Sequence, residues 1–167
     1  MVANADTPDQ QFEFASGLYQ QKLYSLAAEK FDDFLKNNPT SPNAVLASYE
    51  LAAALYRVTK PDYAAVATAY EKALTKPAPT PQIAAAARLE VGDAYYQLQK
   101  YDQAIKSLTA YLVSVPAPEK DNAGWAQYWI AESDYALKKN NEARAAYTKV
   151  VAQYGDNEDV APYSQYA

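Results

Sequence analysis

A pattern that returns every 38 to 39 residues constrains this chain more than any other feature. Similar segments begin at Tyr24, Tyr63, Tyr101 and Asn140. In each of them a small residue stands four positions before a large one, and the pairs are Ala27/Phe31, Val66/Tyr70, Ala104/Leu108 and Ala143/Tyr147. Residues four apart share one face of a helix, so each segment predicts a helix that a neighbouring helix can approach closely.

A second amphipathic helix is predicted before each of these segments. Its pattern is clearest in 89–98 and 128–137 and looser in 12–19 and 49–56. Apolar residues recur there at intervals of three and four, which is typical of a helix, and no stretch alternates for long with period two. The sequence therefore predicts an all-α chain of about four helical hairpins.

Proline and glycine predict where these helices begin and end. Thr7-Pro8, Ser41-Pro42 and Thr80-Pro81 each place a capping hydroxyl before a proline suited to the first helical turn, and Gln10 allows a capping box with Thr7. Gly155 is predicted to end the last helix in a left-handed conformation, and Pro39, Pro77 and Pro116 to close the others. The predicted helices are 8–21, 24–37, 42–58, 61–75, 81–99, 101–114, 122–138 and 140–154.

The repeats define an array over residues 8–158, with hairpins at about 8–39, 42–77, 81–116 and 122–155. Residues 1–7 contain Ala3-Asn4-Ala5, which has the small-x-small form of a signal-peptidase site, so this segment is interpreted as a signal-peptide remnant or a disordered tail. Residues 159–167 predict the start of a further helix. That helix belongs either to a longer array, which we favour, or to a cap over the last hairpin.

Composition excludes several classes of function. Among 167 residues there is no cysteine and no histidine, which removes the usual zinc ligands, the cysteine nucleophile and the commonest general base. The net charge of -5, with 15 scattered basic residues, argues against a nucleic-acid partner. No apolar run approaches the roughly 18–20 residues of a membrane span. We therefore expect a non-enzyme with no cofactor, no metal and no direct membrane insertion.

The segments 92–108 and 125–154 resemble tetratricopeptide repeats, and the resemblance extends over nearly all of 9–154. It is weaker in the first two copies, where Ala15 and Ala53 replace the usual mid-helix glycine. The resemblance implies a right-handed α-solenoid whose concave groove, lined by the first helix of each hairpin, binds a segment of a partner protein.

Projecting that groove onto the sequence selects a mixture of aromatic, acidic and polar residues. Tyrosine suits an interface because it offers a rigid ring and a polar tip. For Tyr19, Tyr96 and Tyr135 groove binding and packing are both left open, whereas Tyr70, Tyr95, Tyr101 and Tyr147 are predicted to pack between helices. The predicted groove residues are Phe12, Ser16, Tyr19, Gln20, Glu50, Arg57, Leu89, Asp93, Tyr96, Gln97, Trp125, Tyr128, Glu132 and Tyr135.

The resemblance also bears on the ligand. Chaperone-binding relatives hold a carboxylate terminus with Lys, Asn and Arg, but the matching positions here are Phe12, Ser16 and Leu89, which argues against such a ligand. Inward-facing acids favour a basic or amide-rich, partly apolar segment, although Arg57 opposes this; the acids are Glu50, Asp93 and Glu132.

A carboxylate pair or an acidic loop offers an alternative chemistry that we disfavour. Asp93 with Glu132 is the best pair for glycoside hydrolysis or cation binding, but charged residues on a helix face are usually only solvated. The loop 156–159 lacks the spacing and the glycine of a calcium-binding loop.

The repeats are similar to those of bacterial cell-envelope proteins, such as Tol-Pal-associated periplasmic coordinators and outer-membrane assembly lipoproteins. The features that carry this similarity are the long period, the run 128–133 and the ending Gln153-Tyr154-Gly155. This resemblance implies a non-catalytic scaffold for envelope assembly or maintenance, located in the periplasm, with the cytoplasm as the alternative. A self-assembling module, or a regulatory or targeting domain of a larger protein, are the alternative functions.

Overall fold

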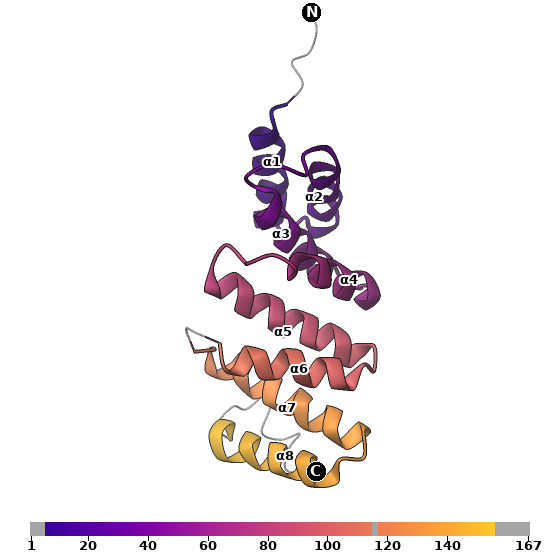
Figure 1. Ribbon diagram of the computed structural model, residues 1–167, viewed down its shortest axis with the longest axis vertical. Helices are drawn as coiled ribbons and strands as arrows, with labels where there is room; N and C mark the ends of the chain where they lie inside the picture. Colours follow the sequence, from indigo (N-terminus) through magenta and orange to yellow (C-terminus); the bar gives the residue numbers. More distant parts are fainter. Residues whose placement is uncertain (1–5, 115–116, 156–167) are drawn as a thin grey trace, which may run out of the picture. The chain divides into compact units, whose positions relative to one another are not determined.

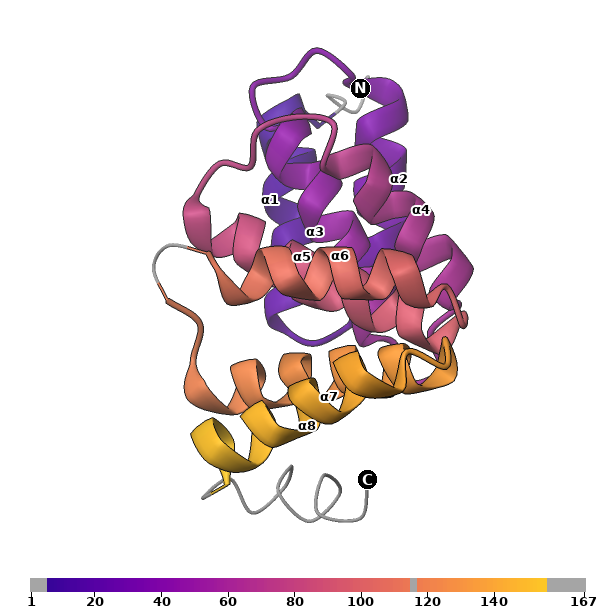
Figure 2. The ribbon, with the colours of Figure 1, turned by 60° about the horizontal axis from the view of Figure 1, so that its bottom comes forward.

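The structure, a computed structural model, describes residues 6–114 and 117–155. This part of the chain contains eight α-helices and no strand, which confirms the predicted all-α class (Figure 1). Consecutive helices form the hairpins α1/α2, α3/α4, α5/α6 and α7/α8, and the two helices of the last hairpin lie side by side (Figures 1 and 2). The helices are α1 Pro8–Gln20, α2 Tyr24–Asn37, α3 Ala44–Arg57, α4 Tyr63–Ala73, α5 Pro81–Gln97, α6 Tyr101–Leu112, α7 Lys120–Ala136 and α8 Asn140–Tyr154.

The chain divides into two compact units, one up to Thr80 and one from Pro81 onward. Unit 1 contains α1 to α4 and unit 2 contains α5 to α8. Each unit therefore holds two of the four hairpins that the repeat pattern predicts, and within each unit the second helix of the first hairpin packs on the first helix of the next.

The small and large residues of the repeat pattern form the seam of every hairpin, as predicted. All eight residues are buried, and Phe31, Leu108 and Tyr70 are among the largest fully buried side chains. Burying one such side chain contributes roughly 1.5–3 kcal/mol to folding. Tyr95 is buried as well and Tyr101 is half-buried, in agreement with their predicted packing role.

Gly92 allows an especially close contact in the third hairpin. A Cβ atom at this position would lie 2.7 Å from both Cγ and Cδ2 of Leu108, closer than packed carbon atoms approach. Leu108 is itself fully buried and cannot move aside freely. Glycine is therefore required here by the approach of α6 to α5.

Alanine takes the corresponding place in the other hairpins. Ala15, Ala54 and Ala131 stand nine residues before α2, α4 and α8, as Gly92 stands before α6, and all three are fully buried. The prediction of Ala53 for the second hairpin is wrong, because Ala53 is only half-buried. In this hairpin α3 ends six residues before α4 begins, whereas each of the other first helices ends four residues before its partner begins.

Three hairpin turns use a residue other than glycine in the left-handed conformation. Lys22, Gln99 and Lys138 have φ values of 61°, 59° and 59°. In the first turn the Lys22 N–H donates to Tyr19 O at 2.9 Å and the Leu23 N–H donates to Leu18 O at 3.0 Å, and the other two turns repeat these bonds. This is the Schellman arrangement that closes a helix. It explains why α1, α5 and α7 end one or two residues before the predicted bounds.

The helix starts follow the predicted caps only in part. The capping box at Thr7 and Gln10 is present, with Thr7 N–H donating to Gln10 Oε1 at 2.8 Å. The Ser41-Pro42 prediction is wrong, because α3 begins at Ala44 and the Ser41 hydroxyl accepts a hydrogen bond from the Asn43 N–H within the preceding turn. In α4 the cap is Asp62, whose carboxylate accepts from two N–H groups of the first turn.

Gly155 also differs from the prediction, since its φ of -68° lies in the right-handed region. The predictions for residues 1–5, for Pro116 and for 156–167 lie outside the described residues. Within the described ranges no helix has the length and apolar character needed to cross a membrane.

Candidate functional site

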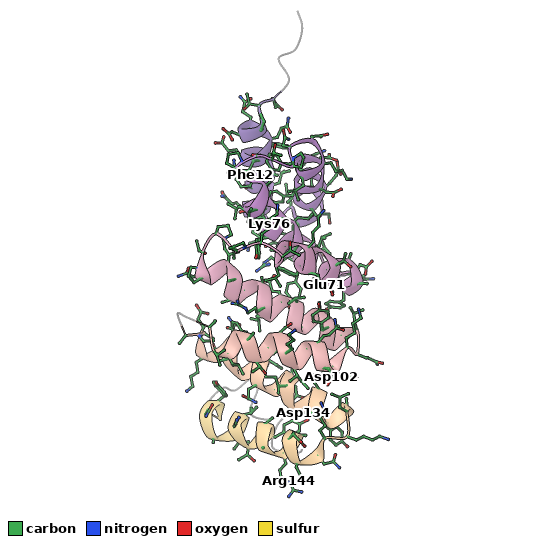
Figure 3. All side chains as sticks on the ribbon, viewed as in Figure 1. Phe12, Glu71, Lys76, Asp102, Asp134 and Arg144 are labelled. Carbon is green, nitrogen blue, oxygen red and sulfur yellow. The ribbon has the colours of Figure 1, made fainter. Side chains whose placement is uncertain are left out.

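The predicted site residues lie on the first helices of the hairpins, which touch in pairs within each unit. In unit 1 the pair is α1 with α3, and in unit 2 it is α5 with α7. Phe12, one of the predicted residues, lies on α1 (Figure 3). Each unit therefore presents its own two-helix surface, and the two surfaces differ in composition.

In unit 1 a polar contact joins the two first helices. The Ser16 hydroxyl on α1 donates a hydrogen bond of 2.9 Å to Glu50 Oε2 on α3. Burial raises the pKa of the half-buried Glu50 carboxyl, and the Ser16 hydrogen bond opposes that rise. The structure thus brings two predicted groove residues together, and each is a partner of the other.

Arg57 lies over the ring of Tyr19 in the same unit. Its Cζ is 5.8 Å from the ring centroid, which is within cation–π range, and its Nη1 donates to Ala53 O at 3.2 Å. The Tyr19 ring also meets the edge of Tyr24, with centroids 5.3 Å apart. A basic group of the chain itself therefore occupies this part of the predicted groove.

Phe12 packs against the core of unit 1. Its ring lies 6.1 Å from the ring of Phe31 and 5.7 Å from that of Phe34, and the side chain packs on the buried cluster of α1, α2 and α3. Its half-buried state follows from this packing. Gln20, the remaining predicted residue of α1, is exposed at the end of the helix.

In unit 2 a run of aromatic rings crosses from α5 to α7. Tyr96 stacks on Trp129, with centroids 6.5 Å apart and an interplanar angle of 27°. Trp129 lies 5.9 Å from Trp125, which in turn meets the edge of Tyr128 at 5.9 Å. All four rings are half-buried, so each keeps part of its surface open to solvent.

Carboxylates adjoin these rings. Asp93 is buried and accepts a hydrogen bond of 3.0 Å from Gln97 Nε2. Glu132 Oε1 accepts a short hydrogen bond from the Tyr147 hydroxyl, which comes from α8. Burial raises the pKa of Tyr96, and the charges of Glu132 and Asp93 add to the rise, which is the electrostatic signature of carboxylates close to that ring. We call Asp93, Tyr96, Trp125, Tyr128, Trp129 and Glu132 the aromatic–acidic surface.

Sequence reasoning missed two contributors to this surface. Trp129 was not among the predicted residues, although it stands four positions after Trp125 and therefore shares a helix face with it. Tyr147 was correctly assigned to packing, but its hydroxyl also holds Glu132, and its pKa is raised strongly by burial and by that hydrogen bond. The remaining predicted residues of unit 2 are Leu89, which is half-buried, and Tyr135, which is 64% exposed.

A second polar contact of unit 2 lies at the turn end of its hairpins. Lys139 Nζ is 3.0 Å from Asp102 Oδ1. The pKa of the neighbouring Asp134 is raised by burial, and the charge of Lys139 only partly opposes that rise. Asp102 and Asp134 both lie at this end (Figure 3). The described residues include no group of three or more His, Cys, Asp or Glu that could hold a metal ion.

Helical hairpins that repeat along the chain and pack on their neighbours define the class of helical repeat proteins. Tetratricopeptide repeat models match residues 12–82, 62–121 and 125–157, and the chain belongs to the tetratricopeptide repeat family. Proteins of this family typically act as non-catalytic scaffolds, and their repeats generally mediate protein–protein interactions.

Solved structures show the same fold at low sequence identity. A MamA double mutant (MamA RS-1 ArsTM) is 17% identical with a TM-score of 0.67, covering 90% of this chain and 77% of its own. The nearly identical TPR-like repeats of a putative kinesin light chain from Podosopora anserina are 18% identical with a TM-score of 0.64, covering 97% and 84%. A thermophilic TPR protein of Thermus thermophilus is 19% identical with a TM-score of 0.51, covering 98% and 82%. A comparison with the curated proteins found no match.

Proposed function

We propose that this protein is a non-catalytic scaffold that binds a segment of a partner protein on the first helices of its hairpins. The observation that supports this most is the aromatic–acidic surface of unit 2. Aromatic rings that remain partly exposed beside carboxylates are typical of interface centres, where rings supply contact area and charges select the partner.

The composition of this surface favours a basic or amide-rich, partly apolar partner segment. Asp93 and Glu132 carry negative charge beside Tyr96, whereas the basic Arg57 belongs to unit 1 and already lies over Tyr19. Complementary charge steers association and disfavours acidic ligands. An acidic carboxylate tail therefore fits this surface poorly.

The proposal is tested by capturing partners from extracts of the source cell with immobilised protein. Wild type is compared with Tyr96→Ala and with the control Val113→Ala, which removes a side chain that is 74% exposed at the end of α6. We expect a protein that wild type and Val113→Ala retain and Tyr96→Ala loses. Equal capture by all three proteins would argue that the partner binds elsewhere.

We also propose that the scaffold works in the bacterial cell envelope. The support is in the sequence: the similarity of the 38- to 39-residue repeats, including 128–133, to those of envelope proteins. Separating source cells into periplasmic, membrane and cytoplasmic fractions and probing them with an antibody tests this. Recovery with a cytoplasmic marker would contradict the proposal.

Self-association is a second candidate, favoured by apolar side chains on the first hairpin. Phe14, Leu23 and Leu26 are 57%, 48% and 40% exposed. Such side chains can stabilise contacts between copies. Sedimentation equilibrium over a range of concentrations would show a rising mass if this occurs, and Leu26→Glu should abolish the rise.

A further inference from the structure

We propose that Tyr96, Trp129 and Glu132 form a subsite for one arginine side chain of the partner segment. This inference rests on the proposed function and refines it, because it names the group that the aromatic–acidic surface recognises. The occupant is the guanidinium of an arginine carried by an extended peptide.

The geometry supplies both parts of an arginine site. Tyr96 and Trp129 are nearly parallel, at 27°, and both rings are half-buried, so ring surface remains open on which a flat cation can stack. Glu132 stands three residues after Trp129 on α7, so the two side chains share a helix face, and its charge contributes to the raised pKa of Tyr96. A guanidinium that stacks on the rings can therefore also reach a carboxylate.

Glu132 is held in place and retains capacity for a further donor. Tyr147 donates to Oε1, and in the described part of the chain no lysine or arginine forms an ion pair with Glu132. A carboxylate offers about four lone-pair positions, so one hydrogen bond leaves Oε2 available. The Tyr147 bond fixes the carboxylate orientation, which reduces the entropy lost when a ligand binds.

Unit 1 contains the same kind of contact within the chain. Tyr19 stands four residues after the buried Ala15, and Tyr96 stands four residues after the buried Gly92, so the two tyrosines occupy equivalent places in their repeats. Over Tyr19 lies the guanidinium of Arg57. Over Tyr96 and Trp129 no basic group lies within the described ranges, so a cation that binds there comes from another molecule.

Arginine suits this subsite better than lysine. Its guanidinium is planar, stacks on aromatic faces and is weakly hydrated, whereas the lysine ammonium is a compact, strongly hydrated charge. Tryptophan is the ring that attracts cations most strongly. Arginine also presents parallel N–H groups that match the two oxygens of a carboxylate.

The two tryptophans of the chain, Trp125 and Trp129, both belong to the aromatic–acidic surface, so their fluorescence reports on ligand binding directly. The probes are capped pentapeptides Ala-Pro-X-Pro-Ala in which X is arginine, citrulline, lysine or glutamate. Citrulline keeps the shape of arginine and removes its charge. We expect the arginine peptide to bind about fivefold more tightly than the citrulline peptide, with a difference that shrinks as salt is added.

Four variants assign the effect to the subsite. Glu132→Gln keeps an oxygen acceptor for Tyr147 and should weaken the arginine peptide about fivefold without changing the citrulline peptide. Tyr96→Leu should weaken the arginine peptide, and Tyr96→Phe, which restores a ring, should bind it as wild type does. Glu13→Gln removes the same charge from an exposed site on α1 and should change nothing.

Equal affinity for the arginine and citrulline peptides, an unchanged Glu132→Gln variant, or no arginine binding up to about 10 mM would each overturn the subsite. Circular dichroism of every variant excludes loss of folding as the cause. A captured partner that depends on Tyr96 but not on Glu132 would leave the proposed function in place and remove the arginine subsite. If wild type and Tyr96→Ala captured the same partner equally well, the proposed function of this surface would be contradicted.

Discussion

Units 1 and 2 use the same repeat position in two ways. In unit 1 the tyrosine at this position, Tyr19, is covered by Arg57 of the same chain, whereas in unit 2 its counterpart Tyr96 stacks on Trp129 beside a carboxylate. One surface already contains its cation and the other offers rings and negative charge to a ligand. Repeats with one fold can therefore differ in binding capacity through a few side chains on their first helices.

The small and large residues packed between the two helices of a hairpin also differ between the units. In unit 1 the corresponding residues are buried alanines together with the buried rings of Phe31 and Tyr70, but in the first hairpin of unit 2 glycine lies against the branched Leu108. A branched side chain fills the space that a Cβ would need. The first three hairpins thus fill their seams with different pairs of residues, and the fourth repeats the alanine and tyrosine of the second.

The largest expected effect concerns the core of unit 1. Phe31 is fully buried within it, so Phe31→Ala should cost about 3–5 kcal/mol of the unfolding free energy of that unit. Urea unfolding followed by far-ultraviolet circular dichroism reports on both units, while tryptophan fluorescence reports on unit 2 alone, because Trp125 and Trp129 both lie on α7. We expect the fluorescence midpoint to stay at its wild-type value. A common shift of both signals would show that the two units unfold as one.

A matched pair of glycine substitutions should give opposite signs in the two units. Gly92→Ala forces a Cβ against Leu108 and should destabilise unit 2 by about 1–3 kcal/mol despite the better helix propensity of alanine. Gly17→Ala meets nothing within 4 Å and should stabilise unit 1 by about 0.5–1 kcal/mol. Thermal and urea unfolding of both variants measure this. The same sign in both would contradict the close approach at Gly92.

Removing the internal cation should have a smaller effect. Arg57→Ala deletes the contact with Tyr19 and should cost about 0.5–1 kcal/mol of unit 1 stability, measured as the shift of the circular dichroism midpoint in urea. Lys60→Ala, which removes an exposed charge a few residues along the chain, serves as the control. If the two variants shift the midpoint equally, the contact between Arg57 and Tyr19 stabilises unit 1 no more than any exposed positive charge does.

The smallest expected effect is a pH dependence carried by Glu50. Burial raises the pKa of the Glu50 carboxyl in the folded protein above its value in the unfolded chain. The folded state therefore binds this proton more tightly, and the resulting contribution to folding stability is fully present below about pH 4.3 and is lost as pH rises through the folded pKa. Because the group is partly exposed, the loss should be under about 1 kcal/mol. Glu50→Gln, which can still accept from Ser16, should flatten stability between pH 4 and 7 relative to Glu13→Gln. A wild-type slope in Glu50→Gln would assign the dependence to other groups.

The repeat pattern predicted the helices well because each seam depends on residues only four apart. Ala104 and Leu108 are buried as expected, and so are their counterparts in every hairpin. The turns were harder to predict because their left-handed residues are Lys22, Gln99 and Lys138, which carry no local signal of that conformation. Ser41-Pro42 misled for a related reason, since a proline after a serine also suits the turn that precedes a helix.

The groove on the first helices stays a prediction, and the structure adds the state of each side chain there. The projection onto the repeat assigns Tyr96 and Glu132 to one surface, and in the structure Tyr96 stacks on Trp129, which stands three residues before Glu132 on α7. Phase alone could not show that Phe12 packs into the core or that Arg57 covers Tyr19, because both depend on contacts with residues far away in sequence. Trp129 was missed although its spacing from Trp125 was visible.

The left-handed turns also bear on how this protein could evolve. A lysine or glutamine held at a φ near +60° costs about 1 kcal/mol more than glycine would, and the chain tolerates this at Lys22, Gln99 and Lys138. These positions lie in the turns, outside the aromatic–acidic surface, so replacing them should leave the proposed ligand contacts unchanged. A population selected for growth at higher temperature should therefore accumulate glycine at these three sites early, gaining heat tolerance while its binding preference drifts independently.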